Sequence, residues 1–280
     1  MNEIINKEYK CLNHGFVRLV DIMGDDAAIV QAARTSYGKG TKTISEDRNL
    51  IRYLMRNKHT SPFEMVEFKF HIKLPIFVAR QWIRHRTANV NEYSGRYSEM
   101  PDEFYVPTSD TIKKQSANNK QARDNEGFTE QHSNEIIQKM SATQNNIFSE
   151  YKEFIDDGMA REIARINLPL SIYTEWYWKI DLHNLLHFLK LRLDKHSQYE
   201  IRVYAEIIAN ILKLIVPLTW EAFEDYVLNA VYFSANELKI LKKIIDKIDY
   251  ETLDEDYIKT DLGTREKNEF IDKLKRIKCC

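Results

Sequence analysis

Apolar and polar residues alternate in two stretches of the chain, as they do in strands with one buried face. In 67–74 (EFKFHIKL) the apolar side consists of Phe68, Phe70, Ile72 and Leu74. The stretch 170–180 (LSIYTEWYWKI) alternates in the same way, and 16–23 (FVRLVDIM) also has the composition of a strand. We therefore predict three strands, two of them half-buried.

Helical patterns with start signals lie between these strands. The stretch 24–37 opens on acidic residues, and Ser45 is a plausible cap for a helix that runs to Arg56. Pro75 is expected to start a short helix through IFVARQWIRH.

The motif TSPFE has the features of a helix start. Ser61 fits an N-cap, Pro62 the first helical position and Glu64 the end of a capping box. Further along, 130–157 is predicted to be one long helix that stops at Gly158, a favourable C-cap.

The stretch 181–216 is strongly helical, and Pro217 is expected to end it. Beyond about Tyr226 the chain is charged and helical. By contrast, 110–127 is polar with almost nothing to bury, which predicts a mobile loop or insertion, and deletion of its core, 113–125, is expected to leave activity largely intact. Few strands separated by helices of uneven length indicate an α+β fold, with helices packed on a small, mostly antiparallel sheet.

Composition narrows the class of protein. The formal net charge is −1, which gives no overall drive toward nucleic acid or a membrane. The chain has 8 glycines and no glycine-rich phosphate loop, so a Rossmann or P-loop site is not expected. Cys11, Cys279 and Cys280 form no disulfide framework or metal-binding spacing, and the N-terminus lacks the apolar core of a signal peptide. These features favour a cytoplasmic protein.

Arginines are concentrated in 80–100, which reads RQWIRHRTANVNEYSGRYSEM. From Lys73 to Arg96 there are five basic residues and one acid, while lysine is absent from 74–112. Arginine forks bind phosphate bidentately, and the neighbouring Asn, Ser and Tyr side chains can bond a base or sugar. We expect a small anionic ligand here; the alternatives are a solvated basic loop or a nucleic-acid-binding module, which would bind polynucleotides in a salt-sensitive manner.

In a second cluster of polar side chains, His183 and His187 are four residues apart and precede Asp194 and His196. This spacing permits a zinc site, and hence a metal-dependent phosphohydrolase. However, HNLLH lacks the glutamate of the HExxH motif, so a structural role for the pair is the preferred interpretation.

The segment RHRTANVNEYS, from Arg84 to Ser94, resembles the RHR-x7-S signature of the flavin-dependent thymidylate synthases. HTSPFE, LPIFVARQW, GRYS, AREIARINLP and LRLDKHSQYEIR extend the resemblance over roughly 15–226. It therefore implies a catalytic domain over 1–226 that includes the polar insertion, followed by a charged helical extension over 227–280.

The resemblance implies reductive methylation of dUMP to dTMP. In that reaction 5,10-methylenetetrahydrofolate donates the carbon, and FAD reduced by NADPH supplies the hydride. It also implies a homotetramer with active sites between subunits. No distinct motif marks the folate or NADPH sites.

The same resemblance implies two sets of site residues, with His59 and Glu64 near them. The expected dUMP contacts are Gln81, Trp82, Ile83, Arg84, Glu92, Tyr93, Ser94, Gly95, Arg96, Arg165 and Arg192. The expected FAD contacts are Ser61, Arg84, His85, Arg86, Glu92, Asp181, Leu182, His183 and His187.

The implied chemistry depends on Arg192, to which the family assigns stabilisation of charge on the uracil ring. No cysteine lies in a matching block, so a thiol adduct on the ring has no candidate, and Ser94 has no evident base to activate it. Asn89, Asp181-Leu182-His183 and His187 depart from the residues of some members, which leaves individual flavin contacts open.

Overall fold

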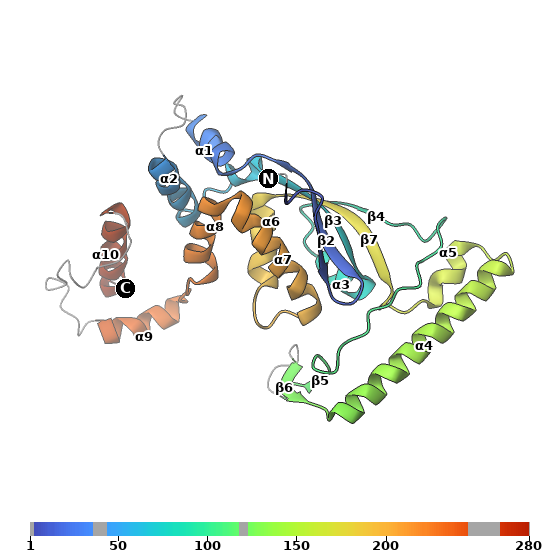
Figure 1. The fold of residues 1–280 in the computed structure, drawn as a ribbon. Coiled ribbons are helices and arrows are strands. Elements are labelled where there is room, and N and C mark those ends of the chain that lie inside the picture. Colours follow the sequence, from blue (N-terminus) through green and yellow to red (C-terminus); the bar gives the residue numbers. More distant parts are fainter. Residues whose placement is uncertain (1–2, 36–43, 118–122, 246–263, 280) are drawn as a thin grey trace. The chain divides into compact units, whose positions relative to one another are not determined.

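The structure is a computed structural model that describes residues 3–35, 44–117, 123–245 and 264–279 (Figure 1). Contacts divide the chain into two compact units, Met1–Leu228 and Asn229–Cys280. The second unit contains α9 (Ala235–Ile245) and α10 (Thr264–Cys279), both amphipathic. The predicted site residues belong to the first unit.

An antiparallel sheet forms the centre of the first unit. Among the described residues its strand order is β1-β2-β3-β7-β4. The bounds are β1 Glu8–Cys11, β2 Gly15–Met23, β3 Glu67–Pro75, β4 Asn89–Glu92 and β7 Tyr173–Asp181. The fold class predicted from the alternating stretches, α+β with a small antiparallel sheet, is confirmed.

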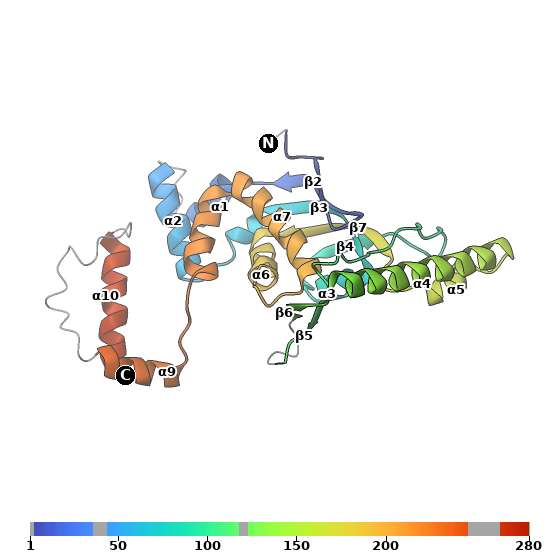
Figure 2. The same ribbon diagram turned by 60° about the horizontal axis from the view of Figure 1, so that its bottom comes forward.

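The predicted alternation decides which face of the sheet is covered. Phe68, Phe70 and Ile72 are fully buried on the face that carries the helices, as Trp176 and Trp178 of β7 are. Three helices lie against this face: α3 (Ile76–Trp82), α6 (Leu182–Arg192) and α7 (Tyr199–Ile215) (Figure 2).

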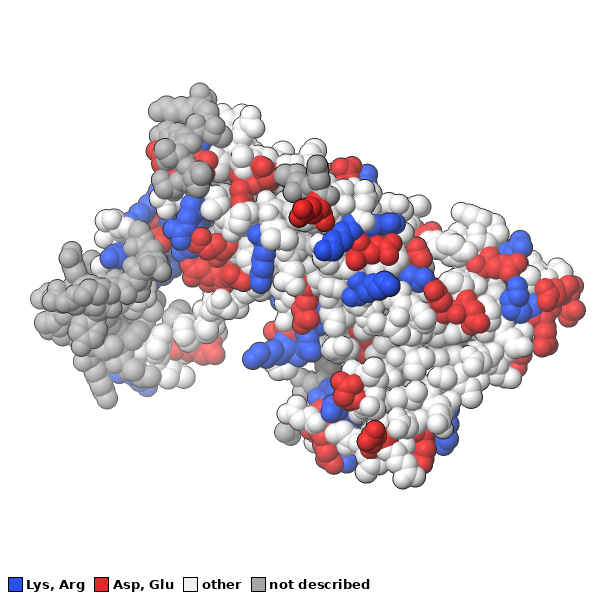
Figure 3. Space-filling view, viewed as in Figure 1, with Lys and Arg blue, Asp and Glu red and all other residues white. Residues whose placement is uncertain are grey.

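The opposite face of the sheet is polar and pairs opposite charges across neighbouring strands. Lys69 Nζ lies 3.1 Å from a carboxylate oxygen of Asp21, and Lys73 Nζ lies 3.5 Å from Glu175 Oε1. Figure 3 shows Lys and Arg interleaved with Asp and Glu over this region, so the face has no single sign of charge.

Further helices complete the first unit at its two sides. Their bounds are α1 Asp26–Thr35, α2 Ile44–Arg56, η1 Phe63–Met65, α4 Glu130–Asp156, α5 Arg161–Ala164, η2 Arg165–Asn167, α8 Pro217–Phe223 and η3 Glu224–Leu228. The prediction for α4 is confirmed: Gly158 follows it in the left-handed region, at φ 83°. Residues 36 and 37 of the predicted first helix, and Cys280, lie outside the described residues.

Several predicted helix boundaries are wrong. Ser45 lies inside α2, and Ser61 makes no capping bond: the Glu64 N–H donates to the Ser61 carbonyl at 3.2 Å, in a single 3-10 turn. The predicted end of the helical stretch at Pro217 is confirmed, since α7 ends at Ile215, and Pro217 then begins the separate helix α8. That stretch is already broken between Arg192 and Tyr199, where α6 ends and α7 begins.

The polar stretch 110–127 is also more ordered than predicted. Lys113–Gln115 (β5) and Arg123–Gly127 (β6) pair as antiparallel strands, although 118–122 lie outside the described residues. Arg123 Nη2 donates to both carboxylate oxygens of Glu200 in α7, at 2.5 Å. The hairpin formed by β5 and β6 is therefore tied to the core by a charge pair that composition does not indicate.

Asp26 of α1 caps α8 from a position almost two hundred residues earlier in the chain. Its carboxylate accepts hydrogen bonds from Leu218 N at 2.8 Å, Thr219 N at 3.0 Å and Thr219 Oγ1 at 2.6 Å. These groups would otherwise be unpaired donors at the helix start. The contact joins the N-terminal and C-terminal parts of the first unit.

We predict that Asp26→Ala lowers the free energy of unfolding by about 1–3 kcal/mol, because buried donors lose their acceptor. Urea unfolding measures the change. Asp21→Ala is the control: it removes an exposed carboxylate paired with Lys69, and should leave the free energy of unfolding almost unchanged. Equal losses in the two variants would contradict a special role for Asp26.

Candidate active site

A cavity of about 350 Å³ lies between the loop that follows α3, the end of β7 and α6. It is lined by Arg84, His85, Arg86, Thr87, Ile180, Asn184, His187, Leu191 and Arg192. Three arginines around one hollow make it a site for an anionic ligand. Five of the predicted site residues meet here: Arg84, His85, Arg86, His187 and Arg192.

The position of the arginine loop depends on how α3 ends. Trp82 is the last residue of the helix and is fully buried, with its ring 4.6 Å from Phe188 and 5.1 Å from Trp178 between ring centroids. Arg84 therefore lies beyond the helix, which ends three residues before the predicted end at His85.

The start of α6 is fixed by Asp181. Its side chain accepts from Asn184 N at 3.0 Å and from Asn184 Nδ2 at 2.7 Å, which caps the helix and holds Asn184 at the cavity. Leu182 is buried in the core, so its side chain faces no ligand. Sequence reasoning missed Asn184, although the Asp-x-x-Asn spacing at a helix start is a signal for this contact.

Arg192 is held from two directions. Its Nε donates to His85 Nε2 at 3.1 Å, and its Nη2 donates to the main-chain oxygen of Gln81 at 3.4 Å. Because an arginine has five N–H donors, some remain for a ligand. Burial lowers the pKa of the guanidinium, whose ordinary value lies so far above neutrality that the group stays charged.

His85 complements this charge by remaining neutral. Burial, the charge of Arg192 and the neighbouring His187 lower its pKa to about 4. Since Nε2 accepts the hydrogen bond from Arg192, the ring proton lies on Nδ1. His85 is therefore an acceptor toward Arg192 and a donor on its other side.

The predicted residues after the loop follow the edge strand β4. Glu92 accepts from Thr174 Oγ1 at 2.8 Å, and the Tyr93 main-chain N donates to Glu175 O at 2.8 Å. The Tyr93 hydroxyl donates to Glu99 O at 2.5 Å. The sheet edge thus orients this segment.

A second group of predicted residues gathers at α5. A Cβ added at Gly95 would lie 2.8 Å from Met100 Sδ and 3.0 Å from Arg165 Cδ, so a larger residue would have to displace these two side chains. The Ser94 hydroxyl accepts from Arg96 N at 3.4 Å, and Arg96 Nε donates to Glu162 Oε2 at 3.0 Å. Figures 1 and 2 both place α5 apart from α6, so this group does not join the cavity within one chain.

The remaining predicted residues lie around these two groups. Ser61 is exposed beside η1, and His59 stacks on Tyr53 at 5.7 Å between ring centroids. The Trp82 side chain is buried and Ile83 is exposed, which leaves Trp82 a packing role. The other three tryptophans are also core residues, since each is at most 5% exposed.

The alternative metal site is not formed. In the part of the chain that the structure describes, no three His, Cys, Asp or Glu side chains are grouped so that they could hold a metal ion. His196 instead pairs with Asp194 at 2.9 Å.

Among the residues that the structure describes, no helix is long and apolar enough to span a bilayer.

A cavity with three arginines on a helix-covered antiparallel sheet has the charge that suits an anionic ligand. Residues 18–218 match the sequence model of a family described as Thymidylate synthase complementing protein. A flavin-dependent thymidylate synthase of Wolbachia pipientis wMel is 60% identical over 245 residues, which cover 88% of this chain and 86% of that protein. One of Treponema denticola is 58% identical over 241 residues, covering 86% and 91%.

A solved structure is similar to this chain in fold and in sequence. The crystal structure of a UMP/dUMP methylase, PolB from Streptomyces cacaoi, bound with 5-Br dUMP, matches with a TM-score of 0.71 at 33% identity. The match covers 79% of this chain and 99% of that chain. The chain belongs to the family of flavin-dependent thymidylate synthases. The predicted family and enzyme class, a methyltransferase, are confirmed.

We predict that His85 makes stability depend on pH between 6.5 and about 4. In this window the unfolded chain binds a proton that the folded chain excludes, so the free energy of unfolding falls as the pH falls. Urea unfolding across the window should show a smaller fall for His85→Gln than for the wild type. His196→Gln, at an exposed histidine outside the cavity, should behave as the wild type; a fall as steep in His85→Gln would contradict the assignment.

Proposed function

We propose that this chain converts dUMP to dTMP by reductive methylation in de novo dTMP synthesis. FAD is the proposed cofactor, with NADPH and 5,10-methylenetetrahydrofolate as co-substrates and the cytoplasm as the compartment. The observation that carries the proposal is Arg192, held half-buried by His85 and Gln81 in the cavity of a chain from this family. The name of the solved relative, a dUMP methylase, supports the substrate.

The residues around the cavity fit a flavin nucleotide. Arg84 and Arg86 are exposed cations suited to its diphosphate, while Asn184 and His187 offer polar groups beside the apolar Ile180 and Leu191. FAD, with an isoalloxazine, a diphosphate and an adenosine, is too large for a hollow of about 350 Å³. The ligand would therefore need further surface beyond this cavity.

A homotetramer with sites between subunits would supply that surface. The two groups of predicted residues, around Arg192 and around Arg165, lie apart in one chain, and chains in an assembly could bring unlike groups together. Apolar side chains next to Arg165 support this proposal: Ile163, Ile166 and Leu170 are 51–71% exposed. Glu92 and Ser61, expected at the flavin, would complete the site in this arrangement.

Arg192 would activate the pyrimidine. Carbon 5 of uracil is a weak nucleophile until negative charge builds on the ring, and a fixed guanidinium near the carbonyl groups stabilises that charge. Partial burial of Arg192 strengthens this attraction relative to water. His85, which stays neutral, orients Arg192 without adding a second positive charge.

A thiol nucleophile is not needed in this scheme. Cys11, the cysteine of the first unit, lies in β1, and burial raises its pKa to about 12. It is therefore protonated at neutral pH and inert as a nucleophile. The reduced flavin, when bound, supplies the hydride.

We predict that purified protein has a flavin absorbance band near one FAD per chain, and that Arg84→Ala weakens both FAD and dUMP binding. Losing one charge-assisted contact costs about 1.5–3 kcal/mol. Ligand titrations measure the change in affinity for each ligand.

The absorbance spectrum also tests the function itself. A protein that stays colourless after addition of FAD would contradict the proposed function. Bound metal would then favour the phosphohydrolase, and salt-sensitive binding of polynucleotides would favour a nucleic-acid-binding module.

We predict that Arg192→Lys slows the oxidation of reduced flavin by dUMP with methylenetetrahydrofolate, because the planar fork is lost. Reduction of FAD by NADPH should change much less, since it needs no uracil activation. Rapid mixing separates the two half-reactions. Arg202→Lys, on α7 beyond the cavity, is the matched control and should leave both unchanged. Collapse of flavin reduction with normal oxidation would show that Arg192 has another role.

A further inference from the structure

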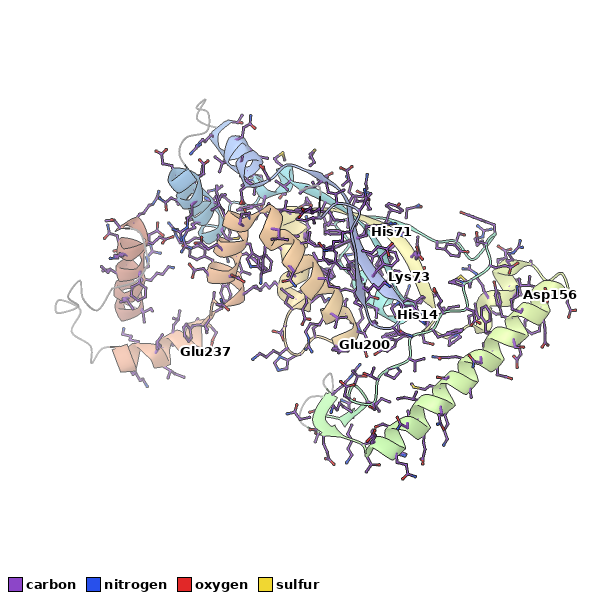
Figure 4. All side chains as sticks on the ribbon, viewed as in Figure 1. His14, His71, Lys73, Asp156, Glu200 and Glu237 are labelled. Carbon is purple, nitrogen blue, oxygen red and sulfur yellow. The ribbon has the colours of Figure 1, made fainter. Side chains whose placement is uncertain are left out.

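Among the residues that the structure describes, the cavity is lined by three arginines and by no carboxylate. The acidic side chains at the starts of α6 and α7 are paired with other groups. Glu200, near the start of α7, accepts from Tyr105 and Arg123, which lie outside the lining (Figure 4). Asp181, at the start of α6, accepts from Asn184 through both oxygens. This second pair reaches the cavity, because Asn184 belongs to its lining.

The Asp181 carboxylate fixes the orientation of the Asn184 amide. Because a carboxylate accepts hydrogen bonds and does not donate them, Asn184 must turn its NH2 group toward Asp181 Oδ2, at 2.7 Å. The main-chain N–H of Asn184 donates to the other carboxylate oxygen at 3.0 Å, which holds the two residues together at the helix start. The Asn184 side chain therefore has one orientation, with Oδ1 turned away from Asp181.

Asn184 Oδ1 is left for a ligand. Across the described parts of the chain it has no hydrogen-bond partner, and it is not closed off from solvent. The three arginines of the lining can only donate, and His85 already uses Nε2 to accept from Arg192. Oδ1 is therefore a hydrogen-bond acceptor in a lining rich in donors.

The position of Asn184 suits a flavin rather than the uracil ring. Eight residues separate Asn184 from Arg192 on α6, which corresponds to about 12 Å along the helix axis. Ile180 and Leu191 are apolar residues of the same lining and can cover a flat ring system. A flavin has such a ring system, and it also has donors, an imide N–H and the hydroxyl groups of its side chain.

We propose that Asn184 binds the flavin as a hydrogen-bond acceptor and that Asp181 is the positioning residue that turns this acceptor toward the flavin. The inference rests on the proposed function. It assigns the flavin contact expected of Asp181 to Asn184, since a carboxylate that faced an anionic cofactor would repel it. Asp181 then acts on the flavin through Asn184.

The test titrates FAD into the flavin-free full chain and follows flavin fluorescence. Asn184→Leu removes the amide and should raise the Kd for FAD at least about tenfold, the loss of one good hydrogen bond. Asp181→Asn keeps the cap of α6, because the oxygen of the new amide can accept from the main-chain N–H. Its NH2 group then faces Asn184, whose amide must reverse and present a donor to the cavity. Asp181→Asn should therefore weaken FAD binding by a similar factor.

The direction of the change in Asp181→Asn distinguishes the amide from simple electrostatics. The substitution removes a negative charge near an anionic ligand, which by Coulomb's law alone would tighten FAD binding. In the double variant the second substitution should add no further loss, because both substitutions act through one hydrogen bond. Asp25→Asn is the matched control: Asp25 caps α1 by accepting from Ala27 N at 2.9 Å, and this variant should bind FAD as the wild type does.

The outcomes separate the inference from the proposed function. A wild-type protein that binds no FAD would overturn both. A wild type that binds FAD, with the Kd unchanged in Asn184→Leu or lowered in Asp181→Asn, would overturn the inference alone. Additive losses in the double variant, or an equal loss in Asp25→Asn, would also overturn it alone. Thermal unfolding checks each fold; if Asn184→Leu does not fold, Asp181→Asn, which keeps the cap, decides the question.

Discussion

The packing of Trp82 into the core determines where the candidate site lies. Its indole is enclosed by Trp178 of the sheet, Phe188 of α6 and Tyr204 of α7, so one side chain joins the sheet to two helices. Because α3 ends at this anchored residue, the next residues must leave the core at once. The arginine loop therefore emerges at a fixed point beside α6, and the cavity forms between them.

The same contact explains why Arg192 is well placed. Phe188 and Arg192 are four residues apart on α6, so they lie on neighbouring turns of one side of the helix. Phe188 packs against Trp82, and Arg192 then reaches His85 and the Gln81 carbonyl on either side of that tryptophan in sequence. The distance between Arg192 and the arginine loop is thus set by apolar packing, which involves no titratable group.

Much of the fold could be predicted because its signals are local. Side-chain alternation identifies β3 and β7, and Gly158 marks the end of α4 by its positive φ. The errors arise where distant residues decide. Asp26 caps α8 by accepting from the two residues that follow Pro217, and nothing near Pro217 in the sequence indicates this distant partner.

The residues of the candidate site also divide into those with a local signal in the sequence and those whose partners are distant. The residues around RHR could be recognised as a group, and the structure brings Arg84, His85 and Arg86 together with Arg192. Asn184 and Glu200 were missed because their importance comes from partners that folding supplies. The charged hairpin, which composition presents as a solvated loop, carries the cation for Glu200.

The charges in the cavity follow from the different ordinary pKa values of its two central basic groups, Arg192 and His85. Burial lowers the pKa of both Arg192 and His85. Guanidinium starts far above neutral pH and remains charged after the shift, whereas imidazole starts near 6.5 and loses its proton. Two protonated groups with nitrogens 3.1 Å apart would repel each other, and deprotonation of His85 is the less costly way to relieve this. The cavity wall thus joins one permanent cation to a neutral acceptor that holds it, an arrangement that keeps Arg192 oriented and charged across the physiological pH range.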